Sequence, residues 1–309
     1  MSDGHESDTS ISLYGRLWPK ITYTSPSEGD QSTDITDALS RLGVSAKYKL
    51  TDTLSAIALA EVRINLGHDG SEDFFTEHLG YVGLESSNMG LFAIGTQWNP
   101  YYNIVAAVTD VYYHRASPFG YDNVGPFREE QIVRYALSFS GVSLDLGTQL
   151  KGQAEGDEDY DKVYAGLGYS YGPVYVGVAY LGDSSGMEQR DYVGLGASLS
   201  LMDDLYVAVT YQSLDYEMSP NRESLDVAAT YSFGSGYTLI AGLFTYDADV
   251  DTSDLHHIGH NLTLVKALTG NVKVFTEWLR KDFDESDNSG QTVDQLSLGI
   301  RIDFNAQVI

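Results

Sequence analysis

Stretches in which apolar and polar residues strictly alternate follow one another along almost the whole of this chain. In the last of them, Leu296 and Leu298 fall on one face of an extended strand, and Ser297 and Gly299 fall on the other. Counting such segments predicts about sixteen strands of roughly nine to thirteen residues each. Only within residues 100–113 does the pattern leave room for a short helix. The alternation therefore predicts an all-β protein.

The connections between the predicted strands alternate in kind. One set is tight, with turn sequences such as LTDT, SSNM, GSG and LTG. The other set is long, polar and acidic, with sequences such as SPSEGDQSTD, GQAEGDEDYD and DFDESDNSGQ. A series of antiparallel hairpins with short turns at one end and long loops at the other explains this alternation.

Strand length separates the two architectures that such a pattern allows. The strands of a soluble β-sandwich are usually about five or six residues long, whereas a strand tilted across a bilayer needs about nine to eleven. In a membrane barrel the apolar face meets lipid and the polar face lines water. A barrel of about sixteen strands encloses an aqueous channel. The terminal strand is then expected to close the barrel by pairing with the first, predicted at 10–20.

Charge and composition exclude several other classes of protein. The net charge of -26, from 44 acidic and 18 basic residues, would repel the phosphates of nucleic acids. Cysteine is absent, which excludes disulfides, thiol catalysis and thiolate metal sites. No segment approaches the roughly 18 apolar residues of a membrane helix. The hydrophilic start, MSDGHESDTS, has no basic region or apolar core and is expected to be a mature N-terminus.

Four segments resemble the trimeric general porins of the Gram-negative outer membrane. They are LYGRL at 13–17, SRLGVSAKY at 40–48, HLGYVGLESSNMGLFAIGTQW at 78–98 and REEQIVRYALSFSGVSL at 128–144. The resemblance implies a 16-stranded antiparallel transmembrane β-barrel, an outer-membrane location, a homotrimer, and contact with outer-membrane lipid and lipopolysaccharide. A small outward face of Ala56, Ala58 and Ala60 would allow close approach of a neighbouring subunit.

The resemblance also divides residues 1–309, a single barrel domain, into functional parts. Residues 1–9 form an N-terminal extension, and residues 305–309 form a tail after Phe304, at which the family usually ends. Residues 98–130 are much longer than a hairpin needs and are rich in aromatic side chains. They correspond to the third loop of porins, which folds inward and narrows the channel.

Strand parity and the resemblance together give candidates for the pore constriction. Parity places Arg16, Arg41, His78 and Arg128 on polar faces, with Arg128 in the same parity as Arg134. The resemblance places basic residues of the constriction at Arg16, Arg41 and Arg128, facing acidic residues of the third loop.

Two positions in this set depart from the family pattern. Asp110 matches the acidic position of the loop best, and a second acid would fall near His114. His78 occupies what is often an arginine position, where a neutral imidazole would weaken the positive side.

Metal sites are weakly indicated. DADVDTSDLHHI begins like a calcium loop, but Thr252 replaces the turn glycine and Ile258 stands where a glutamate ligand belongs. His256 and His260 have a spacing that suits zinc on a helix, but their context is a strand and its loop. We expect no metal, no cofactor and no catalytic site.

The leading hypothesis is a channel for passive diffusion of small hydrophilic solutes and ions, with a mild preference for cations. One alternative is a solute-selective porin, for example for sugars, in which the aromatic residues of the loop offer stacking surfaces; packing against the wall is favoured for them. These residues are Trp98, Tyr101, Tyr102, Tyr112 and Tyr113. An outer-membrane barrel enzyme or adhesin is a more distant alternative.

Overall fold

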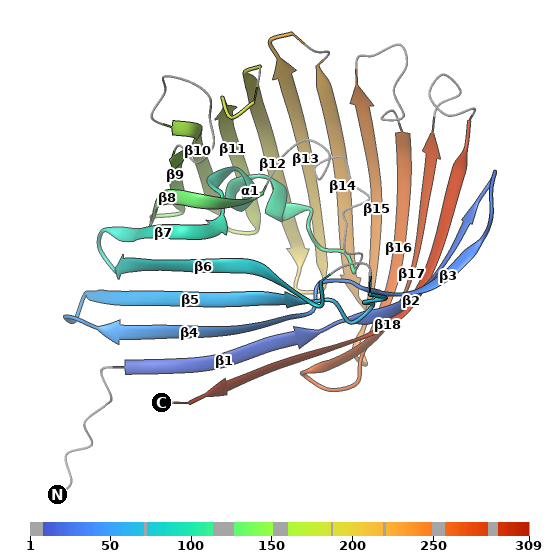
Figure 1. Ribbon diagram of the computed structural model, residues 1–309, viewed down its shortest axis with the longest axis horizontal. Coiled ribbons are helices and arrows are strands. Elements are labelled where there is room, and N and C mark those ends of the chain that lie inside the picture. The colour runs from blue at the N-terminus through green and yellow to red at the C-terminus, as the bar shows by residue number, and fades with distance from the viewer. Residues whose placement is uncertain are drawn as a thin grey trace, which may run out of the picture.

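The strands of this protein form one antiparallel sheet that closes on itself. The computed structural model describes residues 9–70, 73–113, 127–150, 160–186, 188–218, 221–248, 257–283 and 290–308. From β5 to β17 each strand pairs with the strands that precede and follow it in the chain, and β1 pairs with β18, which closes the barrel (Figure 1). The strands are β1 (Thr9–Leu17), β2 (Pro19–Pro26), β3 (Ser32–Asp37), β4 (Arg41–Lys49), β5 (Leu54–Ile64), β6 (Phe75–Ser86), β7 (Gly90–Trp98), β8 (Arg128–Phe139), β9 (Val142–Leu150), β10 (Tyr160–Tyr171), β11 (Val174–Asp183), β12 (Arg190–Met202), β13 (Leu205–Tyr216), β14 (Arg222–Ser232), β15 (Tyr237–Ala248), β16 (His257–Ala267), β17 (Val272–Phe283) and β18 (Thr292–Gln307).

Two of the barrel strands are interrupted. β1 and β2 pair one after the other with β18, while β4 pairs with β1 and β3 pairs with β2. The segments β1–β2 and β3–β4 therefore each act as one strand with a break. With these breaks taken into account, the barrel has the 16 strands that the sequence predicts.

The first hairpin is longer than the sequence predicts. The strand expected at 10–20 continues through β2, and part of the expected loop SPSEGDQSTD forms β2 and β3. The Asp37 carboxylate accepts hydrogen bonds from the backbone N–H of Leu39 (2.9 Å) and Ser40 (2.7 Å), and Ser40 Oγ accepts one from Trp18 N–H (2.7 Å). These side chains satisfy backbone groups at the break, so a polar segment that is typical of a loop extends the hairpin.

The two faces of the strands have opposite character. On β18, Leu298 is 59% exposed on the outside, whereas Ser297 is 1% exposed on the inside. Ile21 on β2 and Val82 on β6 show the same outward exposure. The predicted alternation of an apolar outer face and a polar inner face is confirmed.

The closing strand continues beyond the aromatic residue at which the family pattern ends. The segment expected as a tail, 305–309, extends β18 as far as Gln307, which pairs with Ser12 of β1. Phe304 pairs with Gly15, and a side chain on Gly15 would collide with the phenyl ring. The lack of a side chain at Gly15 therefore lets the ring lie across the seam that closes the barrel.

The helical segments between β7 and β8 are short. They are α1 (Pro100–Ile104) and the 3-10 helix η1 (Ala106–Val108). Proline at the first helical position and the Asn99 cap, whose Oδ1 accepts from Tyr102 N–H at 2.8 Å, start α1 locally. In the described part of the chain, no helix is long and apolar enough to cross a membrane. Figure 1 shows α1 on the inner side of the strands, so the loop folds inward as predicted.

Candidate functional site

The inward loop is fastened to the barrel wall by hydrogen bonds to its backbone. The Tyr175 hydroxyl donates to the carbonyl of Ile104 (2.7 Å), and the Tyr206 hydroxyl donates to the carbonyl of Val108 (2.7 Å). These carbonyls end α1 and η1, where helical carbonyls lack partners within the helix. Two wall tyrosines thus set the position of both helical turns.

Two more contacts extend the attachment across the barrel. Thr109 Oγ1 lies 2.9 Å from Thr210 Oγ1 on β13, and Tyr113 N–H donates to Glu277 Oε2 on β17 (3.1 Å). The loop leaves the wall at β7 and reaches β17 on the inside of the barrel. It therefore occupies part of the cross-section that the strands enclose.

Glycines of the inner wall allow the loop backbone to approach closely. A Cβ on Gly177 of β11 would lie 2.5 Å from the carbonyl oxygen of Ile104. A Cβ on Gly196 of β12 would lie 2.9 Å from the carbonyl oxygen of Val105. Only residues without a side chain leave enough space at these positions.

The aromatic residues of the loop mainly pack against the wall. Tyr101, Tyr112 and Tyr113 are buried. Burial raises the pKa of the Tyr101 and Tyr112 phenols, so both remain neutral. Trp98 and Tyr102 stack on each other with ring centroids 4.4 Å apart and stay partly exposed. Packing, which the sequence favours over solute stacking, accounts for three of the five aromatic candidates.

Arg41 and His78 meet at a carboxylate, that of Glu61, which is not among the constriction residues expected from the sequence. Arg41 Nε lies 3.6 Å from Glu61 Oε2, and His78 Nδ1 contacts Glu61 Oε1. The Glu61 and His78 side chains are only 2% and 4% exposed. Two of the predicted basic residues are therefore bound to one buried acid.

His78 reaches the inside through an irregularity of β6. Gly80 and Val82 line the outer face of the same strand, and strict alternation would place residue 78 on that outer face too. The pairing with β5 shifts register between Glu61 and Val62, so one extra residue is accommodated on β6. This β-bulge turns His78 inward, toward Glu61.

Arg16 belongs to a different cluster. Its Nε lies 2.9 Å from Asp303 Oδ1, and Arg301 Nε lies 2.8 Å from Asp303 Oδ2. Both guanidinium groups lie over the ring of Trp18, at 5.0 Å and 4.8 Å from its centroid. Arg301 and Asp303 alternate with the apolar residues of the closing strand, so the sequence already indicates that both face the lumen. That alternation could have identified them as partners for Arg16.

Arg128 and Asp110 belong to different described segments of the loop region, Asp110 to 98–113 and Arg128 to the segment that begins at 127. Arg128 Nη1 donates to the carbonyl of Glu77 (3.4 Å), and Asp110 accepts a hydrogen bond from the Tyr102 hydroxyl (2.6 Å). A register shift separates Arg128 from Arg134, so the parity argument that linked them does not hold. Among the described residues no ion pair joins Asp110 to a basic candidate, and the second acidic position, near His114, lies outside them.

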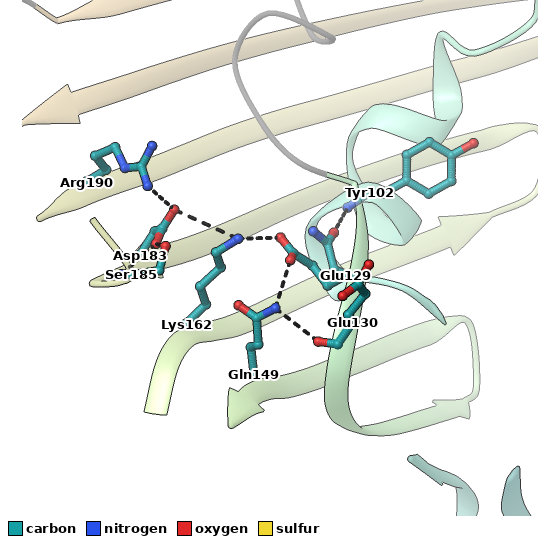
Figure 2. A network of polar contacts seen from close by, with 9 residues as sticks. Tyr102, Glu129, Glu130, Gln149, Lys162, Asp183, Ser185 and Arg190 are labelled. Atoms are coloured by element: carbon teal, nitrogen blue, oxygen red, sulfur yellow. Dashed lines mark hydrogen bonds and ion pairs between the residues drawn. The ribbon is translucent and has the colours of Figure 1, made fainter. Parts of the chain in front are cut away.

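Further charged residues brace the wall beside the loop. Arg134 binds Asp145 through two hydrogen bonds of 2.7 and 2.6 Å, and Asn103 of α1 donates to the same carboxylate (3.1 Å). Figure 2 shows a second network, which includes Glu129 of β8, the strand at which the chain returns to the wall. In it, Lys162 binds Glu129 (2.8 Å) and approaches Asp183 (4.0 Å).

Asp183 extends this second network to β12, because Arg190 binds the same carboxylate at 2.8 Å. Gln149 donates to Glu129 (3.2 Å) and to the carbonyl of Glu130 (3.0 Å). The sequence predicts that such charged residues face the lumen, but it does not predict their partners. In the structure these residues form ion pairs with one another at the base of the loop.

The predicted metal motifs can be compared with the structure only in part. Within the described ranges no three His, Asp or Glu side chains are placed to hold a metal ion. Most of the calcium-like segment at 247–258, including Thr252 and His256, lies outside those ranges.

The family model for Gram-negative porins matches residues 2–304 of this chain. The chain belongs to the Gram-negative porin family. It is therefore an outer-membrane channel, and its family and fold point to a channel rather than to an enzyme. No curated protein matches the chain.

Solved porin structures share the architecture of this porin. The anion-selective porin from Comamonas acidovorans is 18% identical, with a TM-score of 0.78 over 96% of this chain and 100% of that one. OmpF of Salmonella typhi, solved in complex with daunomycin, is 16% identical, with a TM-score of 0.77 over 95% and 97%. The trimer form of OmpT from Vibrio cholerae is 18% identical, with a TM-score of 0.71 over 96% and 99%. At such identities the likeness establishes the fold.

Proposed function

We propose that this porin passes small hydrophilic solutes and ions by passive diffusion, through the space that residues 98–130 leave open, with a mild preference for cations. No reaction is turned over. The observation that carries the cation preference is how the charges of the inner wall are partnered. Arg41 and Arg134 each lie beside a carboxylate, whereas Asp110 is exposed and accepts a hydrogen bond from a neutral hydroxyl, that of Tyr102.

Partnered and unpartnered charges act differently on a permeating ion. The field of an arginine is largely cancelled by a carboxylate within 4 Å, as for Arg41 and Arg134, whereas an isolated carboxylate in a narrow passage attracts cations. The net charge of -26 adds to this attraction at low ionic strength. Arg128 contributes a positive charge at the constriction, and this charge opposes the attraction of cations.

Planar bilayers test this proposal. The protein should give large, steady, stepwise currents, and the reversal potential in a KCl gradient should show a modest excess of cation over anion permeability. Asp110→Asn should lower that ratio because it removes an exposed negative charge, and Arg128→Ala should raise it. Asp191→Asn is the matched control, since Asp191 bonds to the outward-facing Tyr180. Folded protein without stepwise currents would refute the channel, and equal ratios in Asp110→Asn and Asp191→Asn would refute the role of Asp110.

The sugar-selective alternative is less well supported by the geometry. Only the Trp98–Tyr102 stack retains exposed aromatic surface among the loop aromatics considered above. A sugar that binds there should reduce the ion current in a saturable way, whereas the general channel predicts no saturation.

The outer wall supports the proposal of a homotrimer. Ala46, Ala58, Ala60 and Gly80 of β4, β5 and β6 form the floor of a shallow apolar groove on the outer face of the barrel. Small residues allow a neighbouring surface to approach closely within a membrane. The remaining outer face, which is rich in exposed Leu, Val and Tyr, is proposed to meet outer-membrane lipid and lipopolysaccharide.

A further inference from the structure

A cluster of basic side chains lies on the inner wall, between the end of the loop and the short turns. Lys273 and Arg301 pair directly across β17 and β18, and Arg16 pairs with Asp303 across β1 and β18. Lys273 shares the inward face of β17 with Glu277, the attachment point of the loop, and is four residues nearer the short turn. The cluster is therefore on the turn side of the loop.

The cluster carries an excess of positive charge. Lys273 interacts electrostatically with Arg301, Arg16 and Asp303, which shows that the four groups lie close together. Three cations and one carboxylate leave two positive charges uncompensated within it. Within the described residues Lys273 forms no ion pair, and the carboxylate of Asp303 is already shared by both arginines. Like charges held this close repel one another unless an anion joins them.

The arginines are held ready for such an anion. Each directs Nε to Asp303 and lies over the ring of Trp18, so the planes of both guanidinium groups are fixed. The side chains of Arg16 and Arg301 are 19% and 17% exposed, so solvent in the channel reaches them. A planar guanidinium group binds the oxygen atoms of carboxylates and phosphates in pairs.

We infer that Arg16, Arg301 and Lys273 form a binding site for the oxyanion group of a permeating solute, a carboxylate or a phosphate. The inference rests on the proposed channel and adds a solute class to it. Asp110, on the loop, and this cluster, beyond the loop, would then interact with opposite charges in succession. Such a channel suits small solutes that carry both an ammonium and an oxyanion group.

The experiment measures block of the single-channel KCl current by inorganic phosphate and, separately, by succinate. Wild type should show saturable block by at least one of the two, and the more potent blocker identifies phosphate or carboxylate as the preferred group. Lys273→Gln removes one charge at a partly exposed site and should raise the half-blocking concentration about fivefold. Lys273 forms no ion pair in the described residues, so this variant should fold normally.

The matched control is Lys47→Gln, because Lys47 is also on the inner wall but is bound to Glu85. Its half-blocking concentration should equal that of wild type. Arg301→Gln, which also frees Asp303, should weaken the block more than Lys273→Gln does. Equal block in Lys273→Gln, Lys47→Gln and wild type, or no saturation in wild type, would overturn the inference while the channel itself stands. Loss of stepwise currents would instead refute the proposed function.

Discussion

At the scale of single residues, a buried carboxylate decides how the basic side of this porin is presented to the lumen. Glu61 contacts His78 and lies 3.6 Å from Arg41, with only 2% of its side chain exposed. Buried charges of this kind need partners, since leaving one partner unpaired costs several kcal/mol, about 3 to 5. The three side chains therefore act as a unit whose net charge is smaller than the two basic residues suggest.

Glu61→Gln should make the channel less cation-preferring. The substitution removes the negative charge beside Arg41 and leaves an amide of similar size, so the positive field at the wall increases. Reversal potentials should show a higher permeability of anions relative to cations. The free energy of unfolding should fall by about 1–3 kcal/mol because buried hydrogen bonds are weakened. Glu85→Gln, which removes the same charge from an exposed pair with Lys47, is the control. A shift of equal size in both variants would indicate an effect of total charge only.

At the scale of elements, the inward loop is positioned by wall residues that bond to its backbone. Tyr175 and Tyr206 act on the carbonyls that end α1 and η1, and Glu277 acts on the N–H of Tyr113. Backbone bonds fix the path of a loop whatever its side chains are. The path of the loop inside the barrel is thus fixed in part by distant strands, β11, β13 and β17.

Tyr206→Phe should loosen the loop without unfolding the barrel. The lost hydrogen bond to Val108 is worth about 1 kcal/mol, enough to populate a displaced loop more often. Single-channel recordings should show more frequent fluctuations between conductance levels. Tyr211→Phe removes a hydroxyl from the outward face of the same strand, β13. Its conductance fluctuations should be as frequent as those of wild type. Identical traces from the two variants would mean that Tyr206 does not hold the loop.

At the scale of the whole molecule, closure of the barrel leaves an apolar outer surface that membrane lipid or another subunit must cover. Most of that surface consists of large side chains, but the groove over β4–β6 has a floor of alanine and glycine. Close packing of another barrel is favoured where side chains are small. The groove is thus the surface on which the proposed trimer depends.

Ala58→Glu should shift the assembly from trimer to monomer, because a carboxylate would be buried in the proposed subunit contact. Ala241→Glu, also exposed and also mid-strand on the outer face but on β15, is the matched control for the cost of a charge facing lipid. That cost should be alike in both variants and no more than the ~2–4 kcal/mol of a cation at the midplane. Native gels should show loss of the trimer band in Ala58→Glu only. A trimer that survives Ala58→Glu would exclude this groove as the contact.

The architecture of this porin follows from the amino-acid pattern, because strand formation and the direction of each side chain depend on a local alternation that repeats along the chain. That pattern predicts the 16 strands, the closure by β18, the inward loop and the lumenal face of Arg16 and Arg41. Which lumenal charges meet depends instead on how the strands come together in the folded barrel. Glu61 meets His78 through a β-bulge, and Arg16 meets Asp303 across the closing seam, 287 residues apart in the chain. Such partners depend on register between strands, and a pattern within one strand does not contain that register.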